Sequence, residues 1–212
     1  LWNNLGNLYL QCHQPDKAQF AFKQSIRGNS NDAIAWSGLA NTYYQNGEVD
    51  ESIRAYKRSI ELMQGVDLKQ PNRVPTEFSK HFSLQWLHLA MLYIKKHQYQ
   101  KAVDAYKNVL AHDTRNEHVW NELGALYIKM EAHEEAIDAF SKAIELDPNN
   151  GEAYLNLAHA HTKIGKHRDS IPLFEKSIER LPSVRERKLA YHLMEEALRI
   201  VKKNNSVKIC AE

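Results

Sequence analysis

Residues 120–127 read WNELGALY, and residues 136–144 read AIDAFSKAI. In the first stretch Trp120, Leu123 and Tyr127 are three and four positions apart, a spacing that places side chains on one face of a helix. The small and aromatic residues of the second stretch follow the same spacing. The sequence therefore predicts two short helices, each with one apolar face.

This pair of stretches occurs five times along the chain. The first stretches begin at aromatic residues 34 positions apart, except for one step of 50, which indicates an insertion of 16 residues (50 − 34). They are WNNLGNLY at Trp2, WSGLANTY at Trp36, WLHLAMLY at Trp86, WNELGALY at Trp120 and YLNLAHAH at Tyr154. Each is followed by a small residue and, four positions later, a ring: Ala18 and Phe22, Ser52 and Tyr56, Ala102 and Tyr106, Ala136 and Phe140, Ser170 and Phe174.

The repeated unit resembles the tetratricopeptide repeat, whose pattern is W-x2-L-G-x2-Y, then A-x3-F, then P over 34 residues. Only Pro148 and Pro182 supply the terminal proline. The resemblance implies an all-α fold, a right-handed superhelical solenoid of helix-turn-helix repeats with a C-terminal capping helix.

A helix pair of this kind cannot bury both apolar faces alone, but it can bury them against the next pair. Small residues in the first helices mark where we expect backbones to approach most closely. They are Gly6, Ala40, Ala90, Gly124 and Ala158.

The repeat spacing predicts the division of the chain. Residues 183–186 read SVRE, a capping box at the start of a last helix with apolar and polar sides. We expect five repeats within 1–182 (1–32, 33–66, 83–116, 117–150 and 151–182), an insertion at 67–82, a capping helix at 183–203 and a tail at 204–212.

The insertion reads DLKQPNRVPTEFSKHF. Pro71 and Pro75 favour a loop, because proline kinks a helix interior. Thr76 is placed to cap a helix that starts about two turns earlier than in the other repeats. Two interpretations remain open, a tolerated surface insertion and a docking element.

Composition narrows the class of protein. The net charge of +2 gives no case for nucleic acid. No apolar run approaches the roughly 18 to 20 residues of a membrane span, and no signal peptide precedes the first repeat. Cys12 and Cys210 form no metal-type spacing, so a soluble chain in the reducing cytoplasm is expected. Because Leu1 falls within the first repeat, we expect a longer natural chain.

The sequence carries no catalytic motif. There is no glycine-rich phosphate loop. His159, His161 and His167 form the densest histidine group, but His159 and His161 are two residues apart and point to opposite sides of a helix. We expect no enzyme activity, no cofactor and no metal site.

The resemblance implies that the first helices line a concave groove that holds peptides or helices of partner proteins. The groove residues are then those just off the packing stripe. They are Asn3, Asn4, Asn7, Ser37, Asn41, Tyr44, Leu87, His88, Met91, Ile94, Asn121, Glu122, Ile128, Asn156 and His159.

Asparagine recurs in this set, and its amide can bind a peptide main chain. An asparagine ladder of this kind is found in the repeats of the O-linked N-acetylglucosamine transferase, and Asn4 and Asn156 fall at its position. Here Gly38, His88 and Glu122 interrupt it. Either the amides grip a peptide, or they are tolerated on a wet helix face. A second binding mode of this family is a carboxylate clamp that holds the C-terminal tails of heat-shock chaperones. Its residues have no counterpart in this sequence.

The functional prediction is a non-catalytic scaffold that binds a protein or peptide, with no nucleic acid and no membrane. The alternative is a substrate-recruiting or sensor arm of a larger enzyme, such as a glycosyltransferase or a signalling ATPase. Self-association of the chain is a third prediction.

Overall fold

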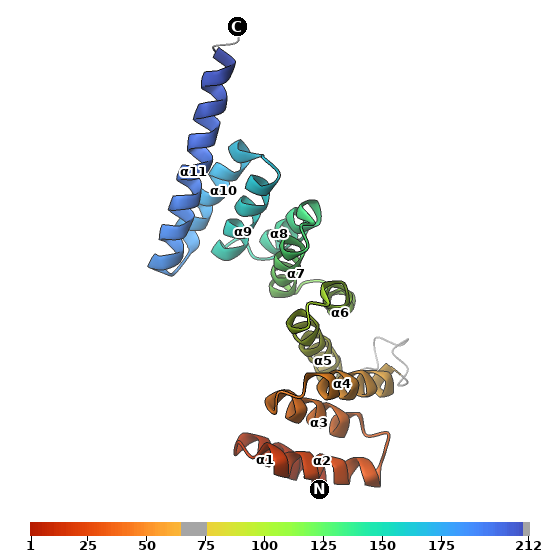
Figure 1. Ribbon diagram of the computed structural model, residues 1–212. Coiled ribbons are helices and arrows are strands. Elements are labelled where there is room, and N and C mark those ends of the chain that lie inside the picture. The colour runs from red at the N-terminus through yellow and green to blue at the C-terminus, as the bar shows by residue number, and fades with distance from the viewer. Residues whose placement is uncertain (65–75, 210–212) are drawn as a thin grey trace. The chain divides into compact units, whose positions relative to one another are not determined.

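The computed structural model describes residues 1–64 and 76–209 of the chain. Every regular element in these two ranges is an α-helix (Figure 1). The all-α prediction is therefore confirmed. Residues 67–75 of the predicted insertion lie outside the described residues. The helices form two compact units, Leu1–His112 and Asp113–Glu212.

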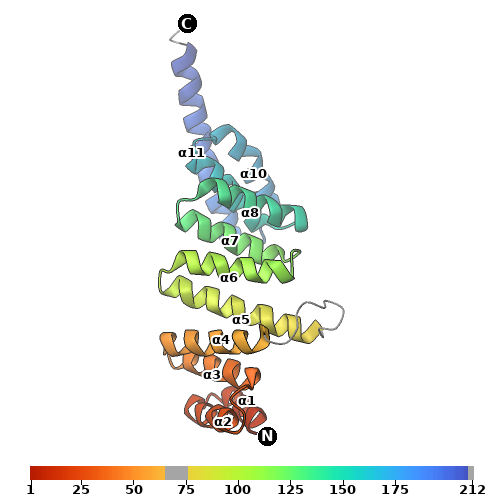
Figure 2. The same cartoon turned by 90° about the vertical axis from the view of Figure 1, so that its right-hand side faces the viewer.

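The first unit contains three helix pairs. Figure 2 shows α3 to α6 as successive layers across the view. The helices are α1 (Trp2–Gln11), α2 (Pro15–Gly28), α3 (Ala33–Gln45), α4 (Val49–Gln64), α5 (Thr76–Lys95) and α6 (Tyr99–His112).

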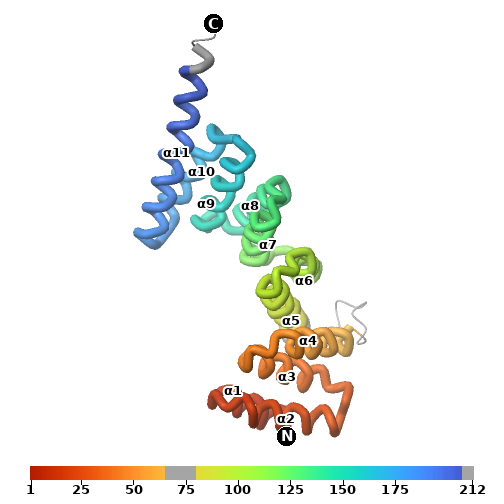
Figure 3. Tube along the Cα trace, in the orientation of Figure 1, coloured from red at the N-terminus to blue at the C-terminus, as the bar shows by residue number. Residues whose placement is uncertain are grey.

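The second unit contains two helix pairs and a longer last helix, which packs along α10 in Figure 3. This last helix runs to Ile209, beyond the predicted end at residue 203. The helices of the second unit are α7 (Glu117–Lys129), α8 (His133–Leu146), α9 (Gly151–Lys163), α10 (His167–Arg180) and α11 (Val184–Ile209).

Helix starts and turns explain the repeat period. Asp32 caps α3 by accepting hydrogen bonds from the N–H groups of Ile34 and Ala35. Asn116 and Asn150 cap α7 and α9 in the same way. The turn inside each pair contains one residue with positive φ, and these residues keep the spacing of the aromatic blocks. They are His13, Gly47, His97, Glu131 and Gly165.

The core rests on rings of the second helices packed against small residues of the first. Phe22 of α2 is fully buried. A methyl group added at Gly6 would lie 2.7 Å from its ring, and one added at Gly38 would lie closer still. Phe140 of α8 has the same relation to Gly124, at 2.6 Å. The ring therefore needs a position without a side chain, as the repeat pattern predicts.

The longer α5 has a local consequence for its tryptophan. Trp36 and Trp120 each donate the indole N–H to a carbonyl six residues earlier, Ser30 at 2.9 Å and Thr114 at 3.1 Å. These carbonyls precede their helices. Six residues before Trp86 the chain is already inside α5, and the buried Nε1 of Trp86 has no partner among the described residues.

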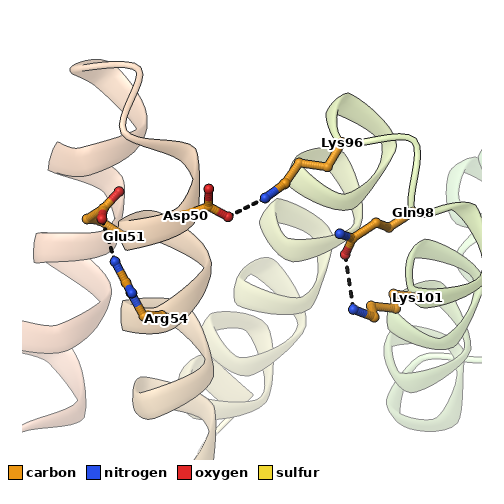
Figure 4. A network of polar contacts seen from close by, with 6 residues as sticks. All are labelled: Asp50, Glu51, Arg54, Lys96, Gln98 and Lys101. Atoms are coloured by element: carbon orange, nitrogen blue, oxygen red, sulfur yellow. Dashed lines mark hydrogen bonds and ion pairs between the residues drawn. The ribbon is translucent and has the colours of Figure 1, made fainter.

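Polar contacts at the surface of the first unit lie both between helix pairs and within them. Figure 4 shows Asp50 at the start of α4 in an ion pair with Lys96, which follows α5. Lys96 holds the pKa of Asp50 below its ordinary value. Lys101 donates to Gln98 Oε1 at 3.1 Å. Such exposed contacts add little to stability, so the buried rings dominate.

Truncating a buried ring should destabilise the chain strongly. We expect Phe22→Ala and Phe140→Ala each to lower the free energy of unfolding by about 3–5 kcal/mol, the cost of removing a buried aromatic side chain. Urea unfolding followed by circular dichroism measures this. Phe20 lies on the same helix as Phe22 and is 58% exposed, so Phe20→Ala should cost less than about 1 kcal/mol. Equal losses at Phe20 and Phe22 would contradict the packing argument.

Adding one methyl group to a glycine should have opposite effects at two sites. Gly38→Ala should lower the melting temperature, because overpacking costs about 1–3 kcal/mol and Phe22 is enclosed on both sides. Gly28 ends α2 and has no atom near the added methyl group, so Gly28→Ala should be neutral or stabilising. A stable Gly38→Ala protein would show that the ring can shift.

Candidate functional site

A hollow of about 260 Å³ lies between α1, α3 and α5 in the first unit. We call it the groove. These are the first helices of their pairs, as the resemblance implies. It is lined by Asn7, Leu10, Ile34, Ser37, Gly38, Asn41, Tyr56, His81, Leu84, Gln85 and His88.

Two asparagine side chains in the groove are available to bind a partner segment. Asn7 is exposed and Asn41 is half-buried. Neither side chain hydrogen bonds to any residue that the structure describes. Ser37, by contrast, donates to the carbonyl of Ile34 at 3.0 Å. Of the predicted residues, the structure thus gathers Asn7, Ser37, Asn41 and His88 here.

His88 and Tyr56 form a neutral pair at the edge of the groove. The Tyr56 hydroxyl lies 3.0 Å from His88 Nδ1, and the ring centroids are 5.3 Å apart. Burial lowers the pKa of His88 and raises the pKa of Tyr56 above its ordinary range. Both side chains are therefore uncharged at neutral pH. Among the side chains that the structure describes, the groove lining contains no Lys, Arg, Asp or Glu, so this lining suits an uncharged segment.

Two of the three interruptions of the asparagine ladder have a structural cause. Gly38 and His88 occupy the same repeat position, two residues after the tryptophan. Each faces the ring of the preceding second helix, Phe22 for Gly38 and Tyr56 for His88. Asparagine at residue 38 would overlap Phe22, so this position belongs to the packing of the pairs.

Several predicted residues of the first unit lie outside the lining of the groove. Asn3 donates to Asp32 Oδ2 at 2.7 Å and so ties α1 to the cap of α3. Tyr44 lies beneath the Lys95 ammonium, 6.0 Å from the ring centroid. The others are Asn4 and Met91, which are exposed, and Leu87 and Ile94, which are half-buried.

In the second unit the predicted amides bind each other. Asn156 of α9 donates to Asn121 of α7 at 3.2 Å, and Asn121 is only 4% exposed. Ile128 packs against the cluster around Phe140. Glu122 and His159 are half-buried, and burial lowers the pKa of His159, with Lys163 and His133 adding to the effect.

The sequence prediction missed groove residues that precede the tryptophan of α5. His81 lies on α5 within the predicted insertion at 67–82, and Leu84 and Gln85 follow it on the same helix, whereas the site prediction for this helix began after Trp86. One signal was available in the sequence. Gln85 stands at the repeat position held elsewhere by Ala35, Val119 and Ala153.

Within the described residues, no group of three His, Cys, Asp or Glu side chains could hold a metal ion. No helix in the same part of the chain is long and apolar enough to cross a membrane. Comparison with curated proteins found no match.

Solved structures share the fold. YrrB, described as a TPR protein with an unusual peptide-binding site, matches with a TM-score of 0.71 at 15% identity, over 92% of this chain and 90% of its own. A MamA protein matches with a TM-score of 0.70 at 22% identity, over 84% and 89%. MamA from Desulfovibrio magneticus RS-1 gives 0.67 at 19% identity, over 86% and 96%. These identities establish the fold alone.

Two family models match the sequence. One, described as a tetratricopeptide repeat, matches residues 153–188, and proteins of this repeat class generally use their stacked helices as binding surfaces. The other, described as the cilia and flagella-associated protein 70 C-terminal domain, matches residues 14–169. Since this match spans well over half of the chain, the protein belongs to the family of the cilia and flagella-associated protein 70 C-terminal domain, built from tetratricopeptide repeats.

Proposed function

We propose that the chain is a non-catalytic scaffold that binds a peptide or helical segment of a partner protein along its first helices. The observation that carries the proposal is the neutral groove between α1, α3 and α5, in which the Asn7 and Asn41 amides have no partner among the described residues. The binding surface then belongs to the repeats at 1–32, 33–66 and 83–116.

The chemistry of the lining supports this proposal. Each free amide offers donors and an acceptor to a peptide main chain. Ile34 and Leu84 are 56% and 47% exposed, so they can bury apolar side chains of the partner. The Tyr56–His88 pair adds no charge. The partner segment is therefore mostly uncharged where it contacts the groove.

The second unit contributes a separate surface in the proposal. Glu122, Ile128, Asn156 and His159 would line it on α7 and α9. Because Asn121 and Asn156 bind each other, a partner would meet a fixed amide pair rather than two free side chains.

The matching family model is described as a domain of a cilia and flagella-associated protein, which supports a ciliary or flagellar setting. We therefore propose a ciliary or flagellar partner instead of the generic cytoplasmic setting predicted from the sequence. The alternative of an arm of a larger enzyme stays a prediction, as does self-association.

A bulky cation in the groove should abolish partner binding. Asn41→Arg replaces a free amide with a longer, charged side chain in an uncharged hollow. A partner that covers the hollow would bury this unpaired charge, which is costly. Affinity capture from an extract of ciliated cells, followed by mass spectrometry, should lose a defined set of proteins with this variant.

Asn46→Arg is the matched control, because Asn46 is exposed at the end of the same helix and outside the groove. It should retain the captured set, and both variants should keep the melting temperature of the parent. Identical captured sets for both variants would contradict binding in the groove.

A further inference from the structure

Gln85 is an unusual residue for its place in the fold. It directly precedes Trp86, and its counterparts in other repeats are Ala35, Val119 and Ala153. These three are fully buried core residues, and Gln85 is itself only 2% exposed. The third repeat therefore places an amide where the others place a small apolar side chain.

One end of this amide lacks a hydrogen-bond partner. Gln85 Nε2 lies 3.2 Å from Met63 Sδ, a weak acceptor. Gln85 Oε1 is buried and has no partner among the described residues. Exchanging the two ends of the amide would leave the nitrogen unpartnered instead. Burying such a group destabilises the free protein relative to an apolar residue at the same position.

Gln85 lies where two hollows meet. It lines the groove and also a second hollow of about 570 Å³, the side pocket. Ile34 and His81 line both as well, so the two hollows adjoin at these three residues. The side pocket is completed by Asn29, Asn31, Asp32, Ala33 and Met63.

The side pocket suits an apolar group. Asp32, the one carboxylate among its described residues, already accepts hydrogen bonds from the Ile34 and Ala35 N–H groups and from the Asn3 and Ser25 side chains. Ile34 and Met63 line the pocket together with Gln85 and supply apolar surface. A guest must therefore offer a polar atom to Gln85 and an apolar side chain to the pocket.

We propose that Gln85 binds the main chain of an extended partner segment that passes from the groove into the side pocket, where an apolar side chain of the segment is buried. The inference rests on the proposed function and specifies the partner. A residue in extended conformation presents its N–H and C=O on one edge, and a primary amide can bind both.

A helical partner does not fit this role. The N–H and C=O groups inside a helix already bind each other, so they cannot satisfy Gln85. The unpaired amide thus selects the extended form from the two kinds of partner that the groove could hold.

The test uses a random peptide display library selected on the 212-residue chain. Peptides that lose binding to the Asn41→Arg variant are groove ligands, and one of them is synthesised. Gln85→Val introduces valine, which stands at the same repeat position as Val119. Gln85→Met keeps the length of the side chain without the amide group. Gln100→Val changes an exposed glutamine of α6 and serves as the control.

We expect Gln85→Val, or Gln85→Met if the valine variant does not fold, to raise the melting temperature and to weaken the peptide about tenfold, the loss of one to two hydrogen bonds. Gln100→Val should change neither. N-methylation at one peptide residue should weaken binding to the parent by a similar factor but leave binding to the Gln85 variant unchanged.

The outcomes separate this inference from the proposed function. Peptides sensitive to Asn41→Arg but bound equally by the Gln85 variants would overturn the role of Gln85 alone. The role of Gln85 would also be overturned if every N-methylated peptide lost as much affinity for the Gln85 variant as for the parent protein. A selection that yields no peptide sensitive to Asn41→Arg would overturn the groove and, with it, this inference.

Discussion

Aromatic rings on the second helices pack against glycine or another small residue on a neighbouring first helix. This packing holds the helix pairs together. Phe22 shows the constraint most clearly, because Gly6 lies on one side of its ring and Gly38 of the next pair on the other. The ring therefore joins two repeats as well as two helices. Interiors packed to this density transmit any change in volume to their neighbours, so the residues that face the ring are constrained by packing.

The same constraint shapes the candidate site. Gly38 and His88 lie two positions after their tryptophans, where a peptide-binding ladder would place asparagine, and each faces the ring of the preceding second helix. Among the described residues of the groove, Asn7 and Asn41 keep side-chain amides without a hydrogen-bond partner. The groove is consequently neutral and mixed in character, with apolar side chains between a few amides.

Helix periodicity predicted much of the fold, including the helix pairs, the buried rings and the start of α5 at Thr76. It predicted the site less well, because periodicity gives the face of a helix on which a side chain lies but not its neighbour on another helix. Asn3 and Asn121 lie on the first helices but bind other side chains. Gln85 was missed because its position is a core position in the other repeats, and the hollows beside it depend on how α3, α4 and α5 pack.

The pairing of each ring with the residue that follows it also fixes the order of the modules. Tyr56 requires a partner such as His88 for its hydroxyl group, whereas Phe22 requires the empty space at Gly38. Exchanging the second and third repeats would set the Phe22 ring, which has no hydroxyl group, against His88 and would separate Tyr56 from His88. Repeats of the same length are thus not interchangeable, because the ring of each repeat is matched to the residue that faces it in the next repeat.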